Sequence, residues 1–136
     1  MTPRGIRDNN PGNIRHGATP WVGELPSPDG GFCVFTESVY GLRAIARVLA
    51  NYQRYDYCRT VSDFIRRWAP PSENDTDAYI LAVCHRIGLV PDGRLDVTNE
   101  GQMVAMIKAI VLHENGVQPY SDSLIEQAVS MAKEAA

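Results

Sequence analysis

Hydrophobic residues recur at helical spacing through most of the chain, and the first clear run covers residues 38–55. Residues three or four positions apart lie on the same face of a helix. The residues that follow this spacing are Val39, Leu42, Ile45, Ala46, Val48, Leu49 and Tyr52. The pattern therefore predicts an amphipathic helix from Ser38 to about Tyr55.

The same spacing predicts two shorter helices. One begins at Thr60 and ends before Pro70 and Pro71, because proline lacks the N–H that a continuing helix needs. The other begins at about Asp75, and Gly88 fits the left-handed position at which many helices end. Their apolar residues are Val61, Phe64, Ile65 and Trp68 in the first, and Tyr79, Leu81, Ala82, Val83 and Ile87 in the second.

Two further helices complete the helical pattern. The central one begins at Asn99, where Gln102 three residues later indicates a capping box, and it continues to Gly116. The last one covers about Asp122 to Glu134. Its apolar residues are Leu124, Ile125, Ala128, Val129 and Met131.

The first 31 residues differ from the rest because they are rich in Gly, Pro, Asn and Asp. Asn9-Asn10-Pro11-Gly12 and Pro26-Ser27-Pro28-Asp29-Gly30-Gly31 are typical of turns. Residues 13–15 and 31–35 are predicted as two short strands of a hairpin-like sheet. Since nothing repeats and no segment resembles a linker, we expect one α+β domain over residues 1–136, mostly helical with a small β element near the N-terminus.

The net charge and the distribution of basic residues indicate whether nucleic acid is a binding partner. The chain has 136 residues and a formal net charge of -3, with its basic residues scattered, which argues against a dedicated nucleic-acid binder. Arg4, Arg7 and Arg15 make the N-terminus locally basic. They either form a small patch for an anionic ligand or are ordinary solvated charges, and the second interpretation is the more common one.

Features that the sequence lacks further limit the localisation and the kinds of site that we expect. No apolar run approaches the roughly 18 residues of a membrane span, and the N-terminus lacks a signal peptide, so we expect a soluble chain made in the cytoplasm without membrane insertion. Cys33, Cys58 and Cys84 form no paired motif and are predicted to be core or half-buried thiols. With only three histidines, we expect no metal site and no organic cofactor.

Carboxylates near aromatic and amide side chains are the chemistry that the sequence does offer. The acidic residues are Glu24, Asp29, Glu37, Glu73, Asp75, Asp77 and Glu114, and the aromatic residues of the same segments are Trp21, Trp68, Tyr79 and Tyr120. Such a set suits a carbohydrate, whose rings stack on flat side chains and whose hydroxyls need paired donors and acceptors. The alternatives are structural, with Trp68 in the core and Glu73 or Asp75 capping a helix.

Glu114 is the most unusual of these carboxylates, because it ends the central apolar helix. The negative end of a helix dipole disfavours an anion by roughly 0.3–1 kcal/mol, so folding alone would prefer Lys or Arg there. A residue that breaks a folding rule is often a functional one. The helix end and the apolar residues before it would favour the protonated form that a general acid needs. The alternative is a surface Glu beside a helix-terminating Gly.

Two long motifs, Arg4-Gly-Ile-Arg-Asp-Asn-Asn-Pro-Gly-Asn-Ile-Arg15 and Arg67-Trp-Ala-Pro-Pro-Ser-Glu-Asn-Asp-Thr76, resemble a family of small phage and prophage proteins. Shorter matches are Trp21-Val-Gly23, Phe32-Cys-Val-Phe35, Gly41-Leu-Arg-Ala44 and His113-Glu-Asn-Gly116, and the resemblance covers nearly the whole chain. Members are often described only as virion structural proteins and are associated with lysozyme-like, peptidoglycan-cleaving activity.

A more distant resemblance is to bacterial glucosaminidases of the lysozyme superfamily. In these a helix ending in a catalytic Glu comes first, followed by an Asn-Asn loop, a Phe-x-x-Tyr strand, a helix beginning near a Gly and a Thr-Asp-x-x-Tyr motif. The counterparts here are 9–15, 32–35, the helix through Gly41, and 75–79, whereas the helix ending in Glu114 comes last. The order implies a circularly permuted lysozyme-like domain, which is reasonable because domain termini are often close together.

The resemblance implies a lytic transglycosylase or a muramidase or glucosaminidase that cleaves the β-1,4 glycan of peptidoglycan. Glu114 would be the general acid, Glu73 or Asp75 a second carboxylate, and the residues implied in substrate binding are Asn10, Asn13, Trp21, Tyr79 and Tyr120. For Asn10 a structural role is the better interpretation, because Asn-Pro-Gly is a turn sequence.

The competing class is a non-catalytic virion or glycan-binding module of the same fold, since a fold does not imply an activity. Without an export signal, the protein would reach the periplasm or cell wall in a virion, through a holin pore or by an injection system. Other virion or secretion-apparatus proteins are then further partners.

Overall fold

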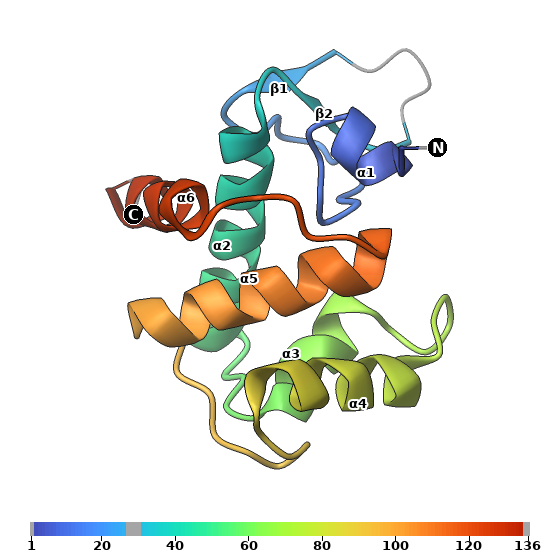
Figure 1. Ribbon diagram of the computed structural model, residues 1–136, viewed down its shortest axis with the longest axis vertical. Helices are drawn as coiled ribbons and strands as arrows, with labels where there is room; N and C mark the ends of the chain where they lie inside the picture. The colour runs from blue at the N-terminus through green and yellow to red at the C-terminus, as the bar shows by residue number, and fades with distance from the viewer. Residues whose placement is uncertain (1, 27–30, 135–136) are drawn as a thin grey trace.

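The described part of the chain, residues 2–26 and 31–134, consists of six helices and one two-stranded sheet in a computed structural model (Figure 1). In chain order the elements are α1 Arg4–Arg7, β1 Glu24–Leu25, β2 Val34–Phe35, α2 Ser38–Tyr55, α3 Val61–Trp68, α4 Thr76–Ile87, α5 Glu100–Asn115 and α6 Asp122–Glu134. The fold is α+β, mostly helical with a small antiparallel sheet near the N-terminus, as the sequence predicts. The predicted turn at 27–30, with Asp29, lies outside the described residues.

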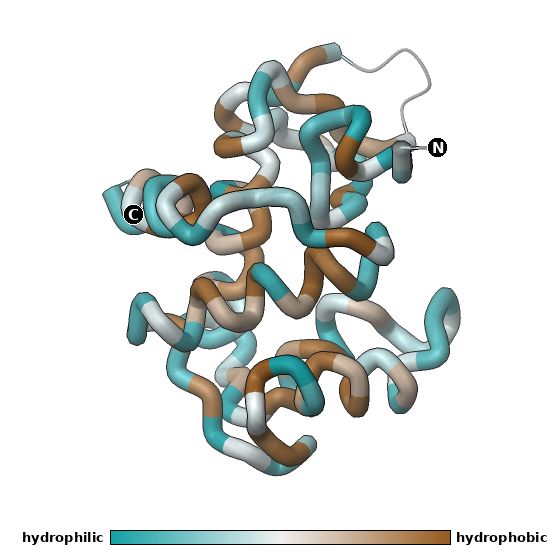
Figure 2. The backbone as a smooth tube through the Cα atoms, viewed as in Figure 1, coloured by the Kyte–Doolittle hydropathy of each residue, from teal (hydrophilic) through white to brown (hydrophobic). Residues whose placement is uncertain are grey.

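Helix α5 crosses the middle of the molecule, with α3 and α4 on one side, α1 and α6 on the other, and α2 passing behind it (Figure 1). Its side chains Met106, Ile107 and Ile110 are fully buried, because neighbouring helices cover it on several sides. Hydrophobic positions recur along α2 and α5 (Figure 2), and many of these residues belong to the main hydrophobic core. The end of α5 is thereby held rigidly beneath the N-terminal segment.

Most predicted helix boundaries are confirmed. Helix α2 covers Ser38–Tyr55 as predicted, and Thr60 caps α3 in a capping box with Asp63. Gly88 adopts the predicted left-handed conformation at the end of α4, with φ 73°. The three cysteines are buried free thiols. No helix of the described residues is long and apolar enough to cross a membrane.

Two details of the helices were predicted wrongly. Leu81 is 60% exposed, because the buried face of α4 runs through Tyr79, Ile80 and Val83, and residue 81 points away from it. Asn99 does cap α5 by accepting the Gln102 N–H, but the Gln102 side chain accepts the N–H of Asp96 instead of returning to Asn99. The capping box is therefore only half formed.

The N-terminal strands also differ from the prediction. The sheet pairs Glu24 with Phe35 and Leu25 with Val34, whereas residues 13–15 contribute only an isolated bridge between Arg15 and Phe32. A turn ahead of β1 explains the change, because Gly23 adopts φ 81° and brings β1 back against β2. The short helix α1 has no periodic signal in the sequence.

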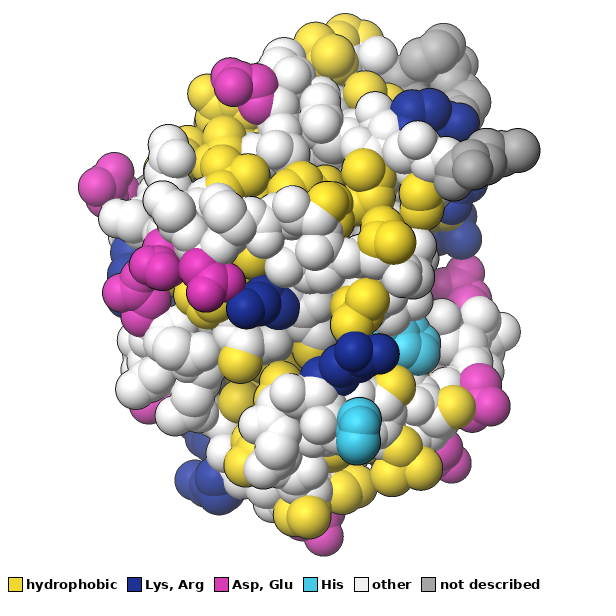
Figure 3. Space-filling model, viewed as in Figure 1, with side chains coloured by type: hydrophobic (Ala, Val, Ile, Leu, Met, Phe, Trp, Pro, Cys, Tyr) yellow, Lys and Arg dark blue, Asp and Glu magenta, His cyan; other side chains and the backbone are white. Residues whose placement is uncertain are grey.

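Lys and Arg side chains are dispersed among Asp and Glu side chains on the face shown in Figure 3. Arg7 pairs with Asp8 at 3.2 Å, and Arg66 pairs with Asp77 at 3.2 Å. The basic residues on this face form no single patch of the kind that nucleic-acid binding requires.

Candidate active site

A cleft of about 370 Å³ opens where the end of α5 meets the N-terminal loop, α2 and the connection between α3 and α4. Its polar lining among the described residues is Arg4, Asn13, Arg15, Glu73, Asn74 and Glu114, and its aromatic lining is Phe32, Tyr52 and Trp68. The cleft thus combines carboxylates, amides, guanidinium groups and aromatic faces. This is the combination that the sequence associated with a carbohydrate.

Glu114 reaches this cleft from the last turn of α5, just before the left-handed Gly116. Asn13 Nδ2 donates to Glu114 Oε1 at 3.0 Å, and the Tyr79 hydroxyl donates to Glu114 Oε2 at 2.8 Å. Each carboxylate oxygen therefore has one fixed partner and keeps a further lone pair. The side chain is half-buried, so it is oriented by the protein while remaining open to the cleft.

The bond from Tyr79 has a fixed direction. Trp68 Nε1, which can only donate, lies 3.1 Å from the Tyr79 hydroxyl oxygen. Tyr79 must accept that hydrogen and direct its own hydrogen to Glu114. Burial first, and then the Glu114 carboxylate, raises the pKa of Tyr79 above its usual value, so the phenol keeps its proton.

Asn13 is placed by the conformation of the N-terminal loop. It adopts φ 49°, in the left-handed region that Asn tolerates better than most residues. Asn10 fixes the loop around it, because its buried side chain donates to the carbonyls of Ile14 and Cys33 and accepts the N–H of Ile14. The structural interpretation of Asn10 is confirmed, and its proposed contact with substrate is wrong, since all its polar groups are engaged.

The end of α5 is joined to the same loop by Asn115. Its Nδ2 donates to the carbonyl of Pro11 at 2.8 Å and to that of Val111 at 2.9 Å. A Cβ on Gly5 would lie 2.5 Å from Asn115 Oδ1, so only glycine fits there. Residues 5–13 and the end of α5 thus form one rigid unit that carries both Asn13 and Glu114.

The opposite wall holds the second carboxylate of the cleft. Glu73 Oε1 lies 3.7 Å from Arg15 NH2, and both side chains are largely exposed. Asp75, the other predicted candidate, does not line the cleft. Its carboxylate accepts the N–H of Ala78 at 3.2 Å and caps α4, so the capping alternative is confirmed for Asp75.

Tyr79, predicted to bind substrate, is only 2% exposed and lies outside the cleft lining, where it contacts Glu114 instead. Two other predicted substrate-binding residues also lie outside the lining. Trp21 packs against the small cluster of Cys33, Phe35 and Ala44 near the sheet. Tyr120 packs against the main core, and its hydroxyl is buried without a hydrogen-bond partner among the described residues. Both rings pack against other hydrophobic side chains. Such long-range contacts cannot be predicted from the local sequence.

Several cleft residues were missed or weighed too low. Trp68 packs against the main core as expected, but it is only half-buried and also lines the cleft. Arg4 and Arg15 flank the Phe32 ring, with their guanidinium carbons 3.6 and 4.9 Å from its centroid. Two of the three N-terminal arginines therefore border the cleft, whereas the sequence alone favoured ordinary solvated charges for all three. Tyr52 and Asn74 carried no separate signal.

Replacing Tyr79 by Phe tests this network. We expect Tyr79→Phe to lower the free energy of unfolding by about 1–3 kcal/mol, because both Trp68 Nε1 and Glu114 Oε2 lose a buried partner. Urea unfolding measures the change. Tyr57→Phe, at a side chain that is 72% exposed, is the control. Equal stability of the Tyr79→Phe protein and the wild type would contradict the network.

The chain is similar to a phage protein. Protein P5 of Pseudoalteromonas phage PM2 is 38% identical over 122 residues, which is 87% of this chain and 74% of Protein P5. No protein-family model matches the chain.

Proposed function

The chain belongs to the family of Protein P5 of Pseudoalteromonas phage PM2, and we propose that it cleaves the β-1,4-linked glycan backbone of peptidoglycan with Glu114 as the general acid. The name of that relative states no activity. A phage has to pass the peptidoglycan of its bacterial host, so a wall-cleaving protein is compatible with this relationship. The argument for cleavage comes from the site itself.

The observation that carries the proposal is the setting of Glu114. A carboxylate at a helix C-terminus is unfavourable for folding, yet here both of its oxygens are held by side chains from distant parts of the chain. The side chain faces a cleft with aromatic walls that suit sugar rings. A module that only binds glycans has no need for an oriented carboxylate in this position.

The hydrogen bonds orient the carboxyl group for proton transfer. Oε1 accepts from Asn13 and Oε2 accepts from Tyr79, and the oxygen that carries the acidic proton would donate it to the glycosidic oxygen. As the bond from C1 to the leaving oxygen breaks, positive charge develops on the sugar ring in an oxocarbenium-like transition state.

The second half of the reaction follows one of two routes. In a hydrolase another carboxylate activates water or stabilises the cation. In a lytic transglycosylase Glu114, now ionised, takes the proton of the muramic 6-hydroxyl as that oxygen bonds to C1. We favour the second route, because the other carboxylate among the described lining residues, Glu73, is exposed and pairs with Arg15.

The two routes give different expectations for Glu73→Gln. On the transglycosylase route the variant keeps its cleavage rate within roughly threefold, since an exposed ion pair contributes only about 0–1 kcal/mol. A required second carboxylate would instead cost about 10²–10⁴-fold. Asp75→Asn is the matched control, because Asn caps a helix as well as Asp does. Initial rates of peptidoglycan solubilisation measure both.

The arrangement of elements also supports a permuted lysozyme-like domain as part of this proposal. The helix ending in Glu114 is last among the matched motifs, but Asn13 of the first matched loop contacts it directly across 101 positions. Tyr79 of the Thr-Asp motif contacts the same carboxylate. The loop and the Thr-Asp motif thus contact the helix that ends in the catalytic Glu, as the motif order of the glucosaminidases implies, even though the order along this chain differs.

A turbidity assay tests the proposed function. Purified peptidoglycan is mixed with the wild-type chain, and both the loss of turbidity and the amount of protein that sediments with the wall are measured. We expect clearing by the wild type. Sedimentation without clearing would support the glycan-binding module instead, and neither clearing nor sedimentation would remove peptidoglycan as the substrate.

A further inference from the structure

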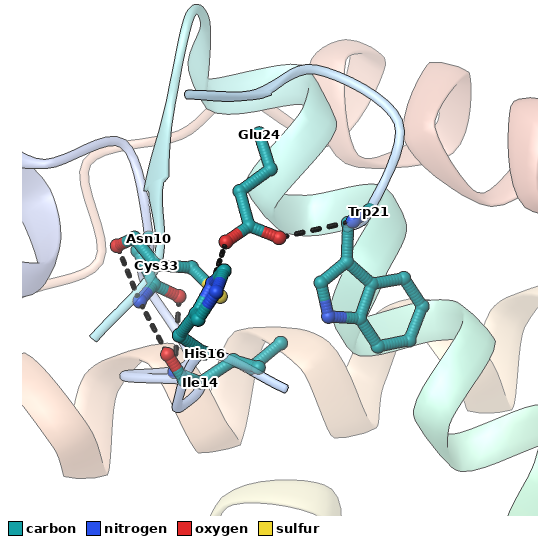
Figure 4. A network of polar contacts seen from close by, with 6 residues as sticks. All are labelled: Asn10, Ile14, His16, Trp21, Glu24 and Cys33. Atoms are coloured by element: carbon teal, nitrogen blue, oxygen red, sulfur yellow. Dashed lines mark hydrogen bonds and ion pairs between the residues drawn. The ribbon is translucent and has the colours of Figure 1, made fainter. Parts of the chain in front are cut away.

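A second polar cluster lies at the sheet, apart from the cleft lining (Figure 4). His16, Glu24 and Cys33 each offer one metal-ligating atom, and these atoms all lie within 4.8 Å of one another. His16 Nδ1 is 2.6 Å from Glu24 Oε2. The three residues come from three separate segments, namely the strand-like stretch after Asn13, β1, and the residue before β2.

The carboxylate of this cluster is buried more deeply than is usual for a charged side chain. The Glu24 side chain is 1% exposed, and Cys33 is 0% exposed, whereas the His16 side chain is 37% exposed. A buried carboxylate is costly unless a cation or several donors compensate it. The compensation comes from the Trp21 N–H, which donates to Glu24 Oε1 at 3.0 Å, and from the His16 ring and the Cys33 thiol.

The surrounding hydrogen bonds orient the three groups toward one point. The Trp21 N–H occupies Glu24 Oε1 and leaves Oε2 facing His16, as Figure 4 shows. Asn10 holds the other two segments, because its amide donates to the carbonyls of Cys33 and Ile14. Such outer partners are what fixes the ligands of known metal sites.

We propose that His16 Nδ1, Glu24 Oε2 and Cys33 Sγ bind a single Zn²⁺ ion. One imidazole nitrogen, one carboxylate oxygen and one thiolate form a donor set that zinc accepts. In a tetrahedral site with Zn–N of about 2.0–2.1 Å and Zn–S of about 2.3 Å, ligand atoms lie roughly 3.3–3.6 Å apart. The present separations, 2.6 Å between His16 Nδ1 and Glu24 Oε2 and at most 4.8 Å within the set, would adjust on binding, and His16 would move outward from Glu24 as the ion enters.

The fourth coordination position would take water from the His16 side, since the His16 side chain is 37% exposed whereas that of Glu24 is 1% exposed. Zinc binding would release the Cys33 proton to solvent. Burial first, and then the Glu24 carboxylate, raises the pKa of the Cys33 thiol to about 12 in the metal-free chain. The ion would replace that proton as the partner of the buried carboxylate.

A bound ion would cross-link the chain segments around the sheet. The hydrophobic cluster beneath the sheet contains only Cys33, Phe35 and Ala44 as buried members, which is a small core for three chain segments. Zinc would tie the segment that follows Asn13 to both strands of the sheet. The site is distinct from the Glu114 cleft, so the inference does not depend on the proposed function.

Cobalt substitution tests the site. Wild-type protein is stripped with a chelator and titrated with Co²⁺ and then with Zn²⁺, and absorbance and bound metal per chain are measured. We expect one ion per chain, a thiolate-to-cobalt charge-transfer band, loss of that band when Zn²⁺ is added, and a rise in the thermal unfolding midpoint with Zn²⁺. Cys33→Ser should lose the band and the rise, whereas Cys84→Ser, at another buried thiol, should keep both.

His16→Ala provides a second test at a position exposed enough to leave the fold intact. We expect its zinc affinity to fall by more than about tenfold, because loss of even an outer partner of a metal ligand costs about 10–100-fold. His85→Ala, an exposed histidine on α4, is the control and should bind as the wild type does. No band in the wild type, or equal binding by wild type, Cys33→Ser and His16→Ala, would overturn the site.

Discussion

Glu114→Gln is expected to slow glycan cleavage by about 10²–10⁴-fold, the usual contribution of a general acid. Gln has the shape of Glu and can still accept a hydrogen bond from Asn13 or Tyr79, but it has no acidic proton to give to the leaving oxygen. Solubilisation rates of purified peptidoglycan at equal protein concentration measure the effect.

Glu126→Gln, at an exposed position on α6, is the matched control for this variant and should clear peptidoglycan as fast as the wild type. Circular dichroism and thermal unfolding of both variants show whether the fold is retained. If the Glu114→Gln protein is folded and clears at the wild-type rate, Glu114 is not the acid.

Gly41→Ala is expected to destabilise the protein. A Cβ at this position would overlap the carbonyl oxygen of Asn9 and lie 2.8 Å from Pro11 Cδ. Overpacking of this kind typically costs about 1–3 kcal/mol, and this exceeds the roughly 1 kcal/mol that Ala gains over Gly inside a helix. The net change in the free energy of unfolding should therefore be destabilising.

The same substitution would displace the loop that carries Asn13, so cleavage should fall together with stability. Gly101→Ala is the control, because it lies in the first turn of α5 with only Asn99 Oδ1 nearby, at 3.3 Å. We expect that variant to stay within about 1 kcal/mol of the wild type in urea unfolding. A Gly41→Ala protein as stable as Gly101→Ala would mean that the loop does not sit on α2 in solution.

The helices could be predicted from the sequence because their signals are local. Thr60, Gly88 and Asn99 mark helix ends by hydrogen bonds or dihedral angles within a few residues. The N-terminal region could not be predicted in the same way. There the pairing of β1 with β2 depends on the turn at Gly23 and on long-range bonds such as Cys33 N–H to the Ile14 carbonyl.

Some residues of the candidate site could likewise be predicted from the sequence, and others could not. Glu114 is visible in the sequence because it violates the helix-dipole preference, and Asn13 and Tyr79 follow from motif resemblance. Whether an aromatic side chain reaches the cleft depends on tertiary packing. For this reason the sequence does not reveal that Trp21 packs beside the sheet outside the cleft lining, or that Trp68 both packs against the core and lines the cleft.

Mass spectrometry of the digestion products tests the central claim most directly. Purified peptidoglycan is incubated with the wild-type chain and with Glu114→Gln, and the soluble fragments are compared. We expect wild-type digests to contain new glycan ends, with 1,6-anhydromuramic ends on the transglycosylase route that we favour. Intact glycan strands, or fragments cut only within the stem peptides, would contradict an acid-catalysed glycan cleavage at Glu114.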